Sequence, residues 1–258
     1  MPVSCNSIFH YTGKLNNLKK IIVDKAFKVS YCSEKITVER DGETSYFGIA
    51  IPMVSFCDIP LTDVESHTKK YGFYGLGLSK QWAIKNGLNP ILYLEKRSNI
   101  TESVSSFDYL IGRLISYPEL IDIDSDAFNN TVKSLQQALN RSLGFMKNYS
   151  DDLNRKKENR IIKNYNFYEE REWRYVPNTI GNNRLMLLDD EYEKNRESFN
   201  LIANKERLKF EYSDVSYIIL RENSKIDSFV KYINKYVKDD KDLLCSKIIT
   251  LEQISKDF

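Results

Sequence analysis

Glycine, proline, histidine and cysteine are all scarce in this sequence. Only 10 glycines and 6 prolines occur in 258 residues, so long disordered linkers are not expected. Two histidines, His10 and His67, are too few for a histidine-rich metal site. The four cysteines include no C-x-x-C pair, which excludes a zinc knuckle or a redox motif of that type. We therefore expect no bound metal and no structural disulfide.

An excess of one charge and long apolar runs are also missing. Lysine and arginine number 38 against 36 acidic residues, which argues against a dedicated nucleic-acid-binding protein. No apolar run approaches the roughly 20 residues that a membrane helix needs. The first residues, MPVSCNSIFHYTG, lack the basic and apolar regions of a signal peptide. These absences predict a cytoplasmic protein without a membrane partner.

Apolar and aromatic residues are present in good supply. The apolar fraction is 41%, enough to bury a sizeable core. The chain holds 17 tyrosines and 13 phenylalanines, which favour half-buried strands and clefts.

Periodicity in the sequence predicts both strands and helices. The predicted strands are 7–11, 27–31, 53–57, 74–78, 90–94, 172–176, 208–212, 216–220 and 247–250. The predicted helices are 12–25, 61–70, 80–86, 101–117, 126–147 and 225–237. Residues 33–50 are expected to form an exposed loop with a weak hairpin at Asp41-Gly42. Residues 151–163 are charged and are expected to form a solvated turn or helix end.

The order of these elements predicts the domain organisation. Two long helical segments separate two strand-rich halves, and no repeat or low-complexity tract is present. One α+β domain over residues 1–258, with a helical insertion at about 101–150, fits this order better than two independent domains.

The first candidate site segment is Phe9-His10-Tyr11-Thr12. Its histidine lies on the first predicted strand, just before a helix, so the side chain points either into the core or into a cleft. On this segment alone, a satisfied core histidine is favoured over a ligand-binding one.

The second candidate segment runs from Tyr71 to Lys80 and holds three glycines among aromatic residues. The glycines permit close approach of the backbone, and a tyrosine such as Tyr74 can stack on a flat heterocycle. The order of the glycines does not match a dinucleotide-binding fingerprint. A tight turn leading into an edge strand explains the segment equally well.

The third candidate segment is FYEEREWRY at residues 167–175. If it is a strand, alternation places Glu170, Glu172 and Arg174 on one face. Two carboxylates beside an arginine are costly to bury without pairing or function. An exposed edge strand with glutamate–arginine pairing is the alternative. In a weaker fourth segment, 53–60, Ser55 can reach a cleft, whereas Cys57 is expected to be a small buried residue.

Several strings in the same order resemble the AbiGi family of bacterial abortive-infection proteins. They are IFHYTGKLNNLKKII, PMVSFCDIPL, KKYGFYGLGLSKQWAIKNGLNPILYL, FMKNY, NFYEEREWRYVP and TLEQISKDF, and together they span nearly the whole chain. The resemblance implies a role in abortive phage resistance, a family role described as that of an antitoxin.

The layout also resembles, more distantly, the ADP-ribosyltransferase fold of the diphtheria-toxin-like and DarT-like branches. This resemblance implies a split β-sheet core and NAD as a substrate. By the order of its motifs, it implies that His10, with Tyr11, Thr12 and Ser55, belongs to the NAD site. Tyr71 or Tyr74 would stack on nicotinamide. Glu172 would polarise the ribose and Glu170 would orient the acceptor, which is a protein, a nucleic acid or water.

Two functions therefore compete, and a third, weaker alternative is nucleic-acid binding through residues 155–163, which the near-neutral net charge disfavours. The first is an NAD-using effector that shuts down the infected cell. The second is a non-catalytic antitoxin or binding module that masks a toxin or another defence-system partner. Such a module would use the same surface or the helical insertion, and it would need no NAD.

Overall fold

The structure is a computed structural model that describes residues 5–117, 125–155, 160–181 and 185–257. Its strands are β1 (Ser7–Thr12), β2 (Ala26–Lys28), β3 (Ser30–Arg40), β4 (Glu43–Cys57), β5 (Tyr74–Ser79), β6 (Asn89–Pro90), β7 (Leu92–Leu94), β8 (Met146–Asn148), β9 (Ser150–Arg155), β10 (Arg160–Asn166), β11 (Glu172–Tyr175), β12 (Leu187–Leu188), β13 (Arg207–Lys209), β14 (Val215–Leu220) and β15 (Ile248–Thr250). Its α-helices are α1 (Leu15–Asp24), α2 (Val64–Tyr71), α3 (Lys80–Lys85), α4 (Asn99–Ser116), α5 (Ser125–Leu143), α6 (Asp189–Lys194), α7 (Arg196–Ala203), α8 (Ile226–Tyr236), α9 (Lys241–Cys245) and α10 (Leu251–Asp257).

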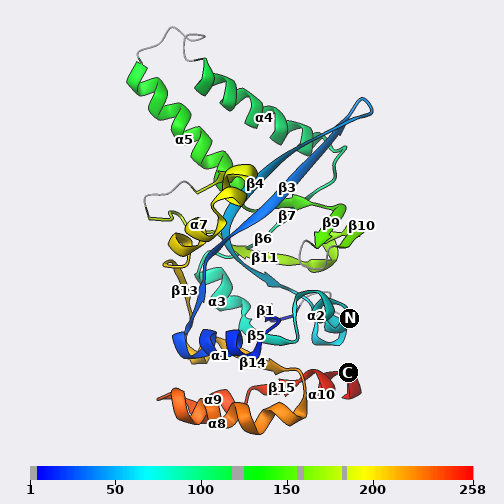
Figure 1. The fold of residues 1–258 in the computed structure, drawn as a ribbon, viewed down its shortest axis with the longest axis vertical. Coiled ribbons are helices and arrows are strands. Elements are labelled where there is room, and N and C mark those ends of the chain that lie inside the picture. The colour runs from blue at the N-terminus through cyan, green and yellow to red at the C-terminus, as the bar shows by residue number, and fades with distance from the viewer. Residues whose placement is uncertain (1–4, 118–124, 156–159, 182–184, 258) are drawn as a thin grey trace.

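The largest sheet of the described residues runs in the order β15-β14-β5-β1-β4-β11-β6, with β3 and β12 also paired to β4. Only the β14–β15 pair in this sheet is parallel. The mixture of sheets and helices confirms the expected α+β class (Figure 1). Within the described residues, no helix is both long and apolar enough to cross a bilayer.

The sheet is nearly divided between β1 and β4. These strands pair only at Phe9 and Cys57, whereas β3 pairs with β4 only as far as Met53. On that side of β4, residues 54–56 therefore lack a strand partner. The interruption separates β1 from most of the length of β4.

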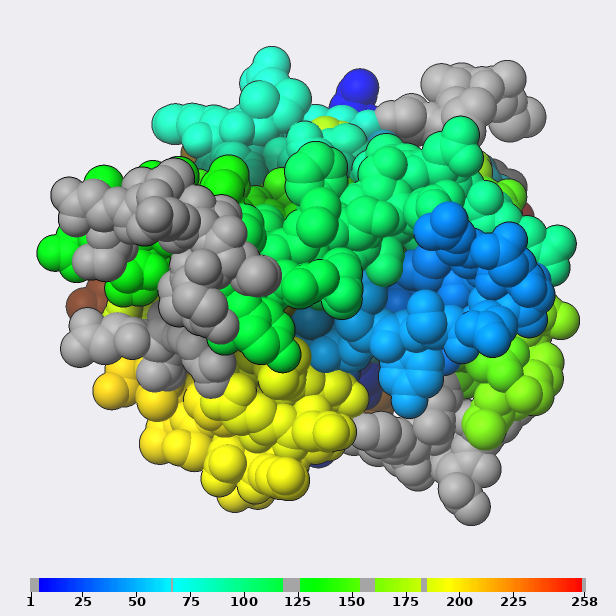
Figure 2. Space-filling model, turned by 90° about the horizontal axis from the view of Figure 1, so that it is seen from above, coloured from blue at the N-terminus to red at the C-terminus, as the bar shows by residue number. Residues whose placement is uncertain are grey.

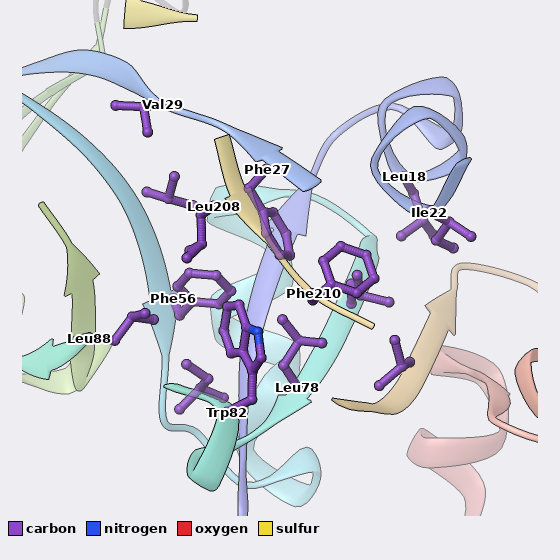
Figure 3. Close-up of a cluster of buried hydrophobic side chains, with 14 of the residues drawn as sticks. Leu18, Ile22, Phe27, Val29, Phe56, Leu78, Trp82, Leu88, Leu208 and Phe210 are labelled. Atoms are coloured by element: carbon purple, nitrogen blue, oxygen red, sulfur yellow. The ribbon is translucent and has the colours of Figure 1, made fainter. Parts of the chain in front are cut away.

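Aromatic residues from distant segments fill the main core (Figure 3). The ring of Phe27 lies 5.1 Å from that of Phe56 and 5.4 Å from that of Phe210. Trp82 packs against Phe56, and its indole N–H donates to the Lys209 carbonyl at 3.1 Å. Burial of each such ring contributes about 2–3 kcal/mol, so this cluster fixes β2, β4 and α3 around one centre.

The helices α4 and α5 project from one end of the sheet (Figure 1). Figure 2, seen from that end, shows α4 beside the tip of the β3–β4 hairpin. Val104 of α4 and Leu143 of α5 join Ile49, Ile51 and Met53 of β4 in a separate apolar cluster. The helices begin and end close to the predicted bounds, except that α5 ends at Leu143. The assignment of residues 1–258 to one domain with an insertion at about 101–150 stays a prediction.

The expectation of a loop at residues 33–50 is wrong. These residues form the long β3–β4 hairpin, whose pairing runs from Ser30 opposite Met53 to Arg40 opposite Glu43. The Asp41-Gly42 turn is confirmed: both residues have positive φ, 51° and 82°, the conformation that a tight two-residue hairpin requires. Charged residues on the exposed face of β3 concealed the alternation.

Three other expectations also need correction. Residues 151–163 contain β9 and part of β10, which pair in a two-stranded sheet rather than forming a turn or helix end; residues 156–159 lie outside the described part of the chain. The strand expected at 90–94 is divided between β6 and β7, which belong to different sheets. The strand expected at 208–212 is the shorter β13, followed by a 3-10 turn.

Candidate functional site

A cavity of about 240 Å³ lies at the gap between β1 and β4. It is lined by residues of β1, β3, β4, α2, β8 and the segment leading into β11. They are Phe9, His10, Tyr11, Cys32, Glu34, Met53, Ser55, Phe56, Cys57, His67, Tyr71, Lys147, Glu170 and Glu172. We call this cavity the central pocket.

The central pocket contains most of the residues that the sequence singled out. His10, Tyr11, Ser55, Tyr71, Glu170 and Glu172 all line it. Thr12 lines a neighbouring cavity that also reaches His10, and Tyr74 packs beside the main core. The structure thus brings six of the eight predicted residues together and leaves Thr12 and Tyr74 outside. Their roles toward a ligand stay predictions.

His10 bridges the gap between β1 and β4. Its Nδ1 lies 2.9 Å from the carbonyl oxygen of Ser55, in the stretch of β4 that has no strand partner. Its ring packs edge-on against Phe27 at 5.0 Å. Because the carbonyl can only accept, Nδ1 carries the proton of the neutral ring. Burial lowers the pKa of His10, with the Ser55 hydrogen bond opposing that effect. His10 therefore contacts both the core and the pocket.

Glu172 is buried and fully hydrogen-bonded. Its Oε1 accepts from the Ser55 hydroxyl at 2.6 Å and from Arg174 Nε at 2.7 Å. Its Oε2 accepts from Lys147 Nζ at 3.0 Å and from Arg174 Nη2 at 3.1 Å. Burial acts to raise the pKa of Glu172, but the charges of Arg174 and Lys147 outweigh it and hold that pKa far below its usual range. The carboxylate is ionised at any physiological pH.

Arg174 is fully buried and uses its whole guanidinium group. Besides Glu172, it donates to the carbonyls of Gly144 and Met146, at 3.1 and 3.3 Å, and to Glu34 of β3. A guanidinium has five N–H donors, and this set engages all of them. The idea of an exposed edge strand is wrong, because β11 lies between β4 and β6. The expected pairing of glutamate with arginine is present.

Glu170 reaches the pocket by a route that strand alternation did not predict. It belongs to a 3-10 turn, Phe167–Glu170, and Arg171 follows with a left-handed φ of 44° before β11 begins. Its carboxylate accepts hydrogen bonds from the Tyr71 hydroxyl and from Lys147 Nζ, the latter at 2.8 Å. The turn brings both carboxylates to one ammonium group.

Among the polar residues that line the pocket, sequence reasoning missed Glu34, His67 and Lys147. Lys147 was placed in a helix, but α5 ends at Leu143 and Lys147 lies in β8, which pairs with β7. Its ammonium group joins Glu170 to Glu172. The string FMKNY pointed to this position only as part of the family resemblance. His67 lies in α2, and no motif in the neighbouring sequence indicated a functional role for it.

The glycines of β5 make room for the aromatic wall of the pocket. A Cβ at Gly75 would lie 2.7 Å from Cε1 of Tyr11, and one at Gly77 would lie 2.6 Å from Cε1 of Phe9. The expected close approach is therefore present, but it is made by side chains of β1. The edge-strand alternative is wrong, because β5 lies between β1 and β14.

The four cysteines are free thiols, and no group of three or more potential ligands suited to a metal ion occurs among the described residues. Cys57 is buried, and burial raises the pKa of its thiol above the ordinary value. A thiol in that state is a poor nucleophile at neutral pH.

Comparison with known proteins identifies related sequences. A family model described as "Putative abortive phage resistance protein AbiGi, antitoxin" matches residues 25–221. The chain is also 31% identical over 232 residues to "Abortive phage resistance protein AbiGi" of Lactococcus lactis subsp. cremoris, with 81% of this chain and 89% of that protein covered. No solved structure matches the chain, so the resemblance to ADP-ribosyltransferases is without support from a known fold.

Proposed function

Since the chain belongs to the AbiGi family, we propose that it is an abortive-infection protein that acts by binding, as an antitoxin that masks a toxin partner. The description of the family supports the antitoxin role, and the name of the lactococcal relative supports the link to phage resistance.

The observation that carries the proposal is the saturation of the Glu172 carboxylate. A carboxylate offers about four lone-pair positions. Ser55, Lys147 and two N–H groups of Arg174 use all four. A glutamate that polarises a ribose must accept a hydrogen bond from the substrate, so Glu172 would first have to lose a partner. The arrangement favours a structural role for this residue and disfavours the catalytic role that an NAD-using effector needs.

The helix α4 offers the surface best suited to a protein partner. Phe107 is 61% exposed and Leu110 is 55% exposed, and their spacing of three places them on one side of the helix. Large exposed apolar side chains on a projecting helix are typical of protein-binding surfaces. A toxin with an apolar groove would bury both side chains.

The test compares two double variants in cells that carry the chain with the genes beside it. Phe107→Ser with Leu110→Ser should unmask the toxin and slow growth even without phage. The matched control, Leu188→Ser with Leu201→Ser, changes leucines that are 62% and 70% exposed elsewhere on the surface, and it should grow normally. Normal growth of the α4 variant, with its protection against phage unchanged, would argue against masking through α4.

An NAD-using effector of the ADP-ribosyltransferase type is the second candidate. The observation in its favour is that His10, Ser55, Tyr71, Glu170 and Glu172 line one pocket. The fit to a whole NAD molecule is poor. The cavity, about 240 Å³, is smaller than the roughly 300–1,000 Å³ of typical ligand sites. The pocket's lysine, Lys147, is already bound to two carboxylates.

The two candidates differ in one measurable outcome. Purified protein incubated with NAD should release no nicotinamide if it is an antitoxin, and it should release nicotinamide at a rate proportional to enzyme if it is an effector. Transfer of ADP-ribose to protein or nucleic acid is measured in the same reaction with labelled NAD. Release by the wild-type protein would replace the antitoxin proposal with the effector.

A further inference from the structure

The central pocket carries an excess of negative charge. Three carboxylates line it, those of Glu34, Glu170 and Glu172, together with one lysine, Lys147. Arg174 is the second cation that pairs directly with these carboxylates, so three negative charges meet two positive ones. A buried charge is costly unless an opposite charge compensates it. This imbalance favours a ligand that brings one positive charge.

Another lysine nearby does not enter the pocket. Lys70 is not one of the lining residues, and its Nζ donates to the hydroxyl of Tyr165 at 3.1 Å. The same ammonium group lies 4.5 Å from the centre of the Tyr165 ring. Lys70 therefore does not supply the missing positive charge inside the cavity.

Glu34 is the carboxylate that has an open position. Its side chain is 13% exposed, and its Oε1 pairs with Arg174. Its Oε2 has no hydrogen-bond partner within the part of the chain that the structure describes. Both oxygens of Glu170 and of Glu172, by contrast, accept hydrogen bonds. An N–H donor in the pocket can therefore bind Glu34 without displacing a protein partner.

His67 is a second open acceptor in the same pocket. It is 9% exposed, and it makes no hydrogen bond to any described residue. Unlike the hydroxyl of Tyr11, which is sealed, its ring nitrogens remain accessible. Burial lowers the pKa of His67 to about 4, against the opposing charges of Glu170 and Glu172, so the ring is neutral at pH 7 and keeps one acceptor nitrogen. A polar side chain this deeply buried normally has a partner, which a ligand can provide.

Apolar and aromatic side chains form much of the remaining wall. Phe9, Met53 and Phe56 line the pocket and can cover the methylene groups of a short chain. Tyr71 is the most exposed lining residue, at 38%, which places the entrance beside its ring. Aromatic rings attract cations through their faces. The volume of about 240 Å³ is below the range of drug-sized ligands and suits one short chain.

The open acceptors indicate which cation fits. A guanidinium group binds best to a carboxylate whose two oxygens are both free, and none of the three pocket carboxylates has that arrangement. An ammonium group has three independent donors, which suit separate acceptors such as Oε2 of Glu34 and a nitrogen of His67. No group of three or more potential ligands suited to a metal ion occurs among the described residues, which disfavours a metal ion here.

We propose that the central pocket binds the ammonium end of a short alkyl chain, with Glu34 and His67 as its hydrogen-bond acceptors and the apolar wall around its methylene groups. The chain belongs either to a free amine or to a lysine side chain of a partner protein. This binding goes beyond the masking proposed for α4 and does not depend on it.

The test titrates the purified full chain with n-butylamine at pH 7 and constant ionic strength, followed by ligand-observed NMR. The amine is protonated at that pH. 1-Butanol is the matched neutral control, because it has the same chain with a hydroxyl in place of the ammonium group. Butylamine should bind at millimolar concentration or below, and butanol should bind at least about 10-fold more weakly. No binding of the amine at about 10 mM, or equal binding of the alcohol, would overturn the proposal.

Two further ligands test the type of cation and assign its source. n-Butylguanidine should bind more weakly than butylamine, and tighter binding would overturn the choice of an ammonium group. Nα-acetyl-lysine methylamide carries the ammonium group on a peptide-like backbone. Binding equal to that of butylamine supports a lysine of a partner protein, whereas much weaker binding supports a free amine.

Variants of the two acceptors make the test specific to the pocket. Glu34→Gln keeps an acceptor oxygen for Arg174 but removes the excess charge, and it should weaken butylamine binding about 10-fold or more. His67→Phe keeps an aromatic ring and all the ion pairs, and it should weaken binding about 3- to 10-fold. Glu43→Gln, on the exposed part of β4, is the matched control and should leave the affinity unchanged. Thermal unfolding identifies the variants that fold, and unchanged affinity in either folded acceptor variant would overturn the proposal.

Discussion

At the residue scale, the carboxylate of Glu172 is a buried charge held by its neighbours. Strand alternation placed it correctly beside Arg174, but the alternative of an exposed edge strand is wrong, since the side chain is 6% exposed. This burial decides what a substitution does, because two cations depend on this carboxylate for their pairing.

The substitution Glu172→Gln should therefore destabilise the fold. Removing one partner of a buried ion pair costs about 3–5 kcal/mol, because the remaining charge is left uncompensated. Chemical denaturation should show this loss in the free energy of unfolding. The control is Glu169→Gln, an exposed neighbour, which should change stability by less than about 0.5 kcal/mol. Equal stability of the two variants would mean that Glu172 is hydrated rather than buried.

The buried histidines predict a dependence of stability on pH. Burial lowers the pKa of His67 to about 4 from an ordinary value of 6.5, so between these values the unfolded chain binds more protons. The contribution is complete above pH 6.5 and is lost as the pH falls toward 4. It amounts to at most about 3 kcal/mol. His10, whose pKa is also lowered by burial, adds to the same slope.

The variant His67→Phe keeps an aromatic ring and removes the titration. Its free energy of unfolding should vary less between pH 6.5 and 4 than that of the wild-type protein. Urea titrations at several pH values measure the difference. Identical slopes for both proteins would show that His67 titrates with an ordinary pKa in the folded state.

At the element scale, β5 depends on its glycines. Gly75→Ala should destabilise the protein by about 1–3 kcal/mol, since its Cβ would meet the Tyr11 ring at 2.7 Å and force the side chain or strand to move. Gly112→Ala in α4 is the matched control, because no atom lies within 4 Å of its added methyl group. That change should stabilise the helix by about 0.5–1 kcal/mol. If Gly75→Ala and Gly112→Ala both shift the thermal midpoint of unfolding in the same direction, the close approach of Tyr11 to Gly75 would be contradicted.

The helices and strands differ in how well they could be predicted from their own sequences. The compact apolar strand β14 and the helix α8 were predictable because their residues fit one periodicity. The β3–β4 hairpin was not, because pairing between its strands compensates for a polar sequence. Helical spacing continues past Leu143, so only tertiary pairing with β7 reveals that Lys147 lies in a strand. For the same reason, the sequence predicted which residues of a single strand share a face, but it did not predict which residues of different strands meet in the site.

The side chains of the central pocket show this limit. His10, Ser55 and Glu172 were identifiable because each lies on a strongly patterned strand. Lys147 and His67 come from segments whose local pattern indicates only a helix. Glu170 lies beside Glu172 in the pocket, as expected, but a 3-10 turn and the left-handed conformation of Arg171 place it there. Strand alternation cannot predict that geometry.

At the scale of the whole molecule, Arg174 connects parts of the chain that are far apart in sequence. Its guanidinium binds β3 through Glu34, the end of α5 through Gly144, and β8 through Met146. The projecting helices and the central sheet are therefore joined at one buried cation.

Replacing that cation should loosen all of these connections together. Arg174→Met should lower the free energy of unfolding by about 3–5 kcal/mol, because Glu34 and Glu172 lose a buried partner. Hydrogen exchange should become faster in β3, β8 and the end of α5 more than in β14. Arg174→Lys should recover only part of the loss, since an ammonium group cannot reproduce the two parallel bonds to Glu172. Faster exchange confined to β11 would show that the connection is local.

The close contact of β1 with the glycines of β5 has a consequence for evolution. The rings of Phe9 and Tyr11 occupy the space that side chains at Gly77 and Gly75 would need. The residue type at position 75 therefore constrains the residue type at position 11, and position 77 constrains position 9 in the same way. Substitutions at the two positions of each pair should be coupled. In diverging relatives, a larger residue at position 75 should be accompanied by a smaller one at position 11, and likewise for positions 77 and 9.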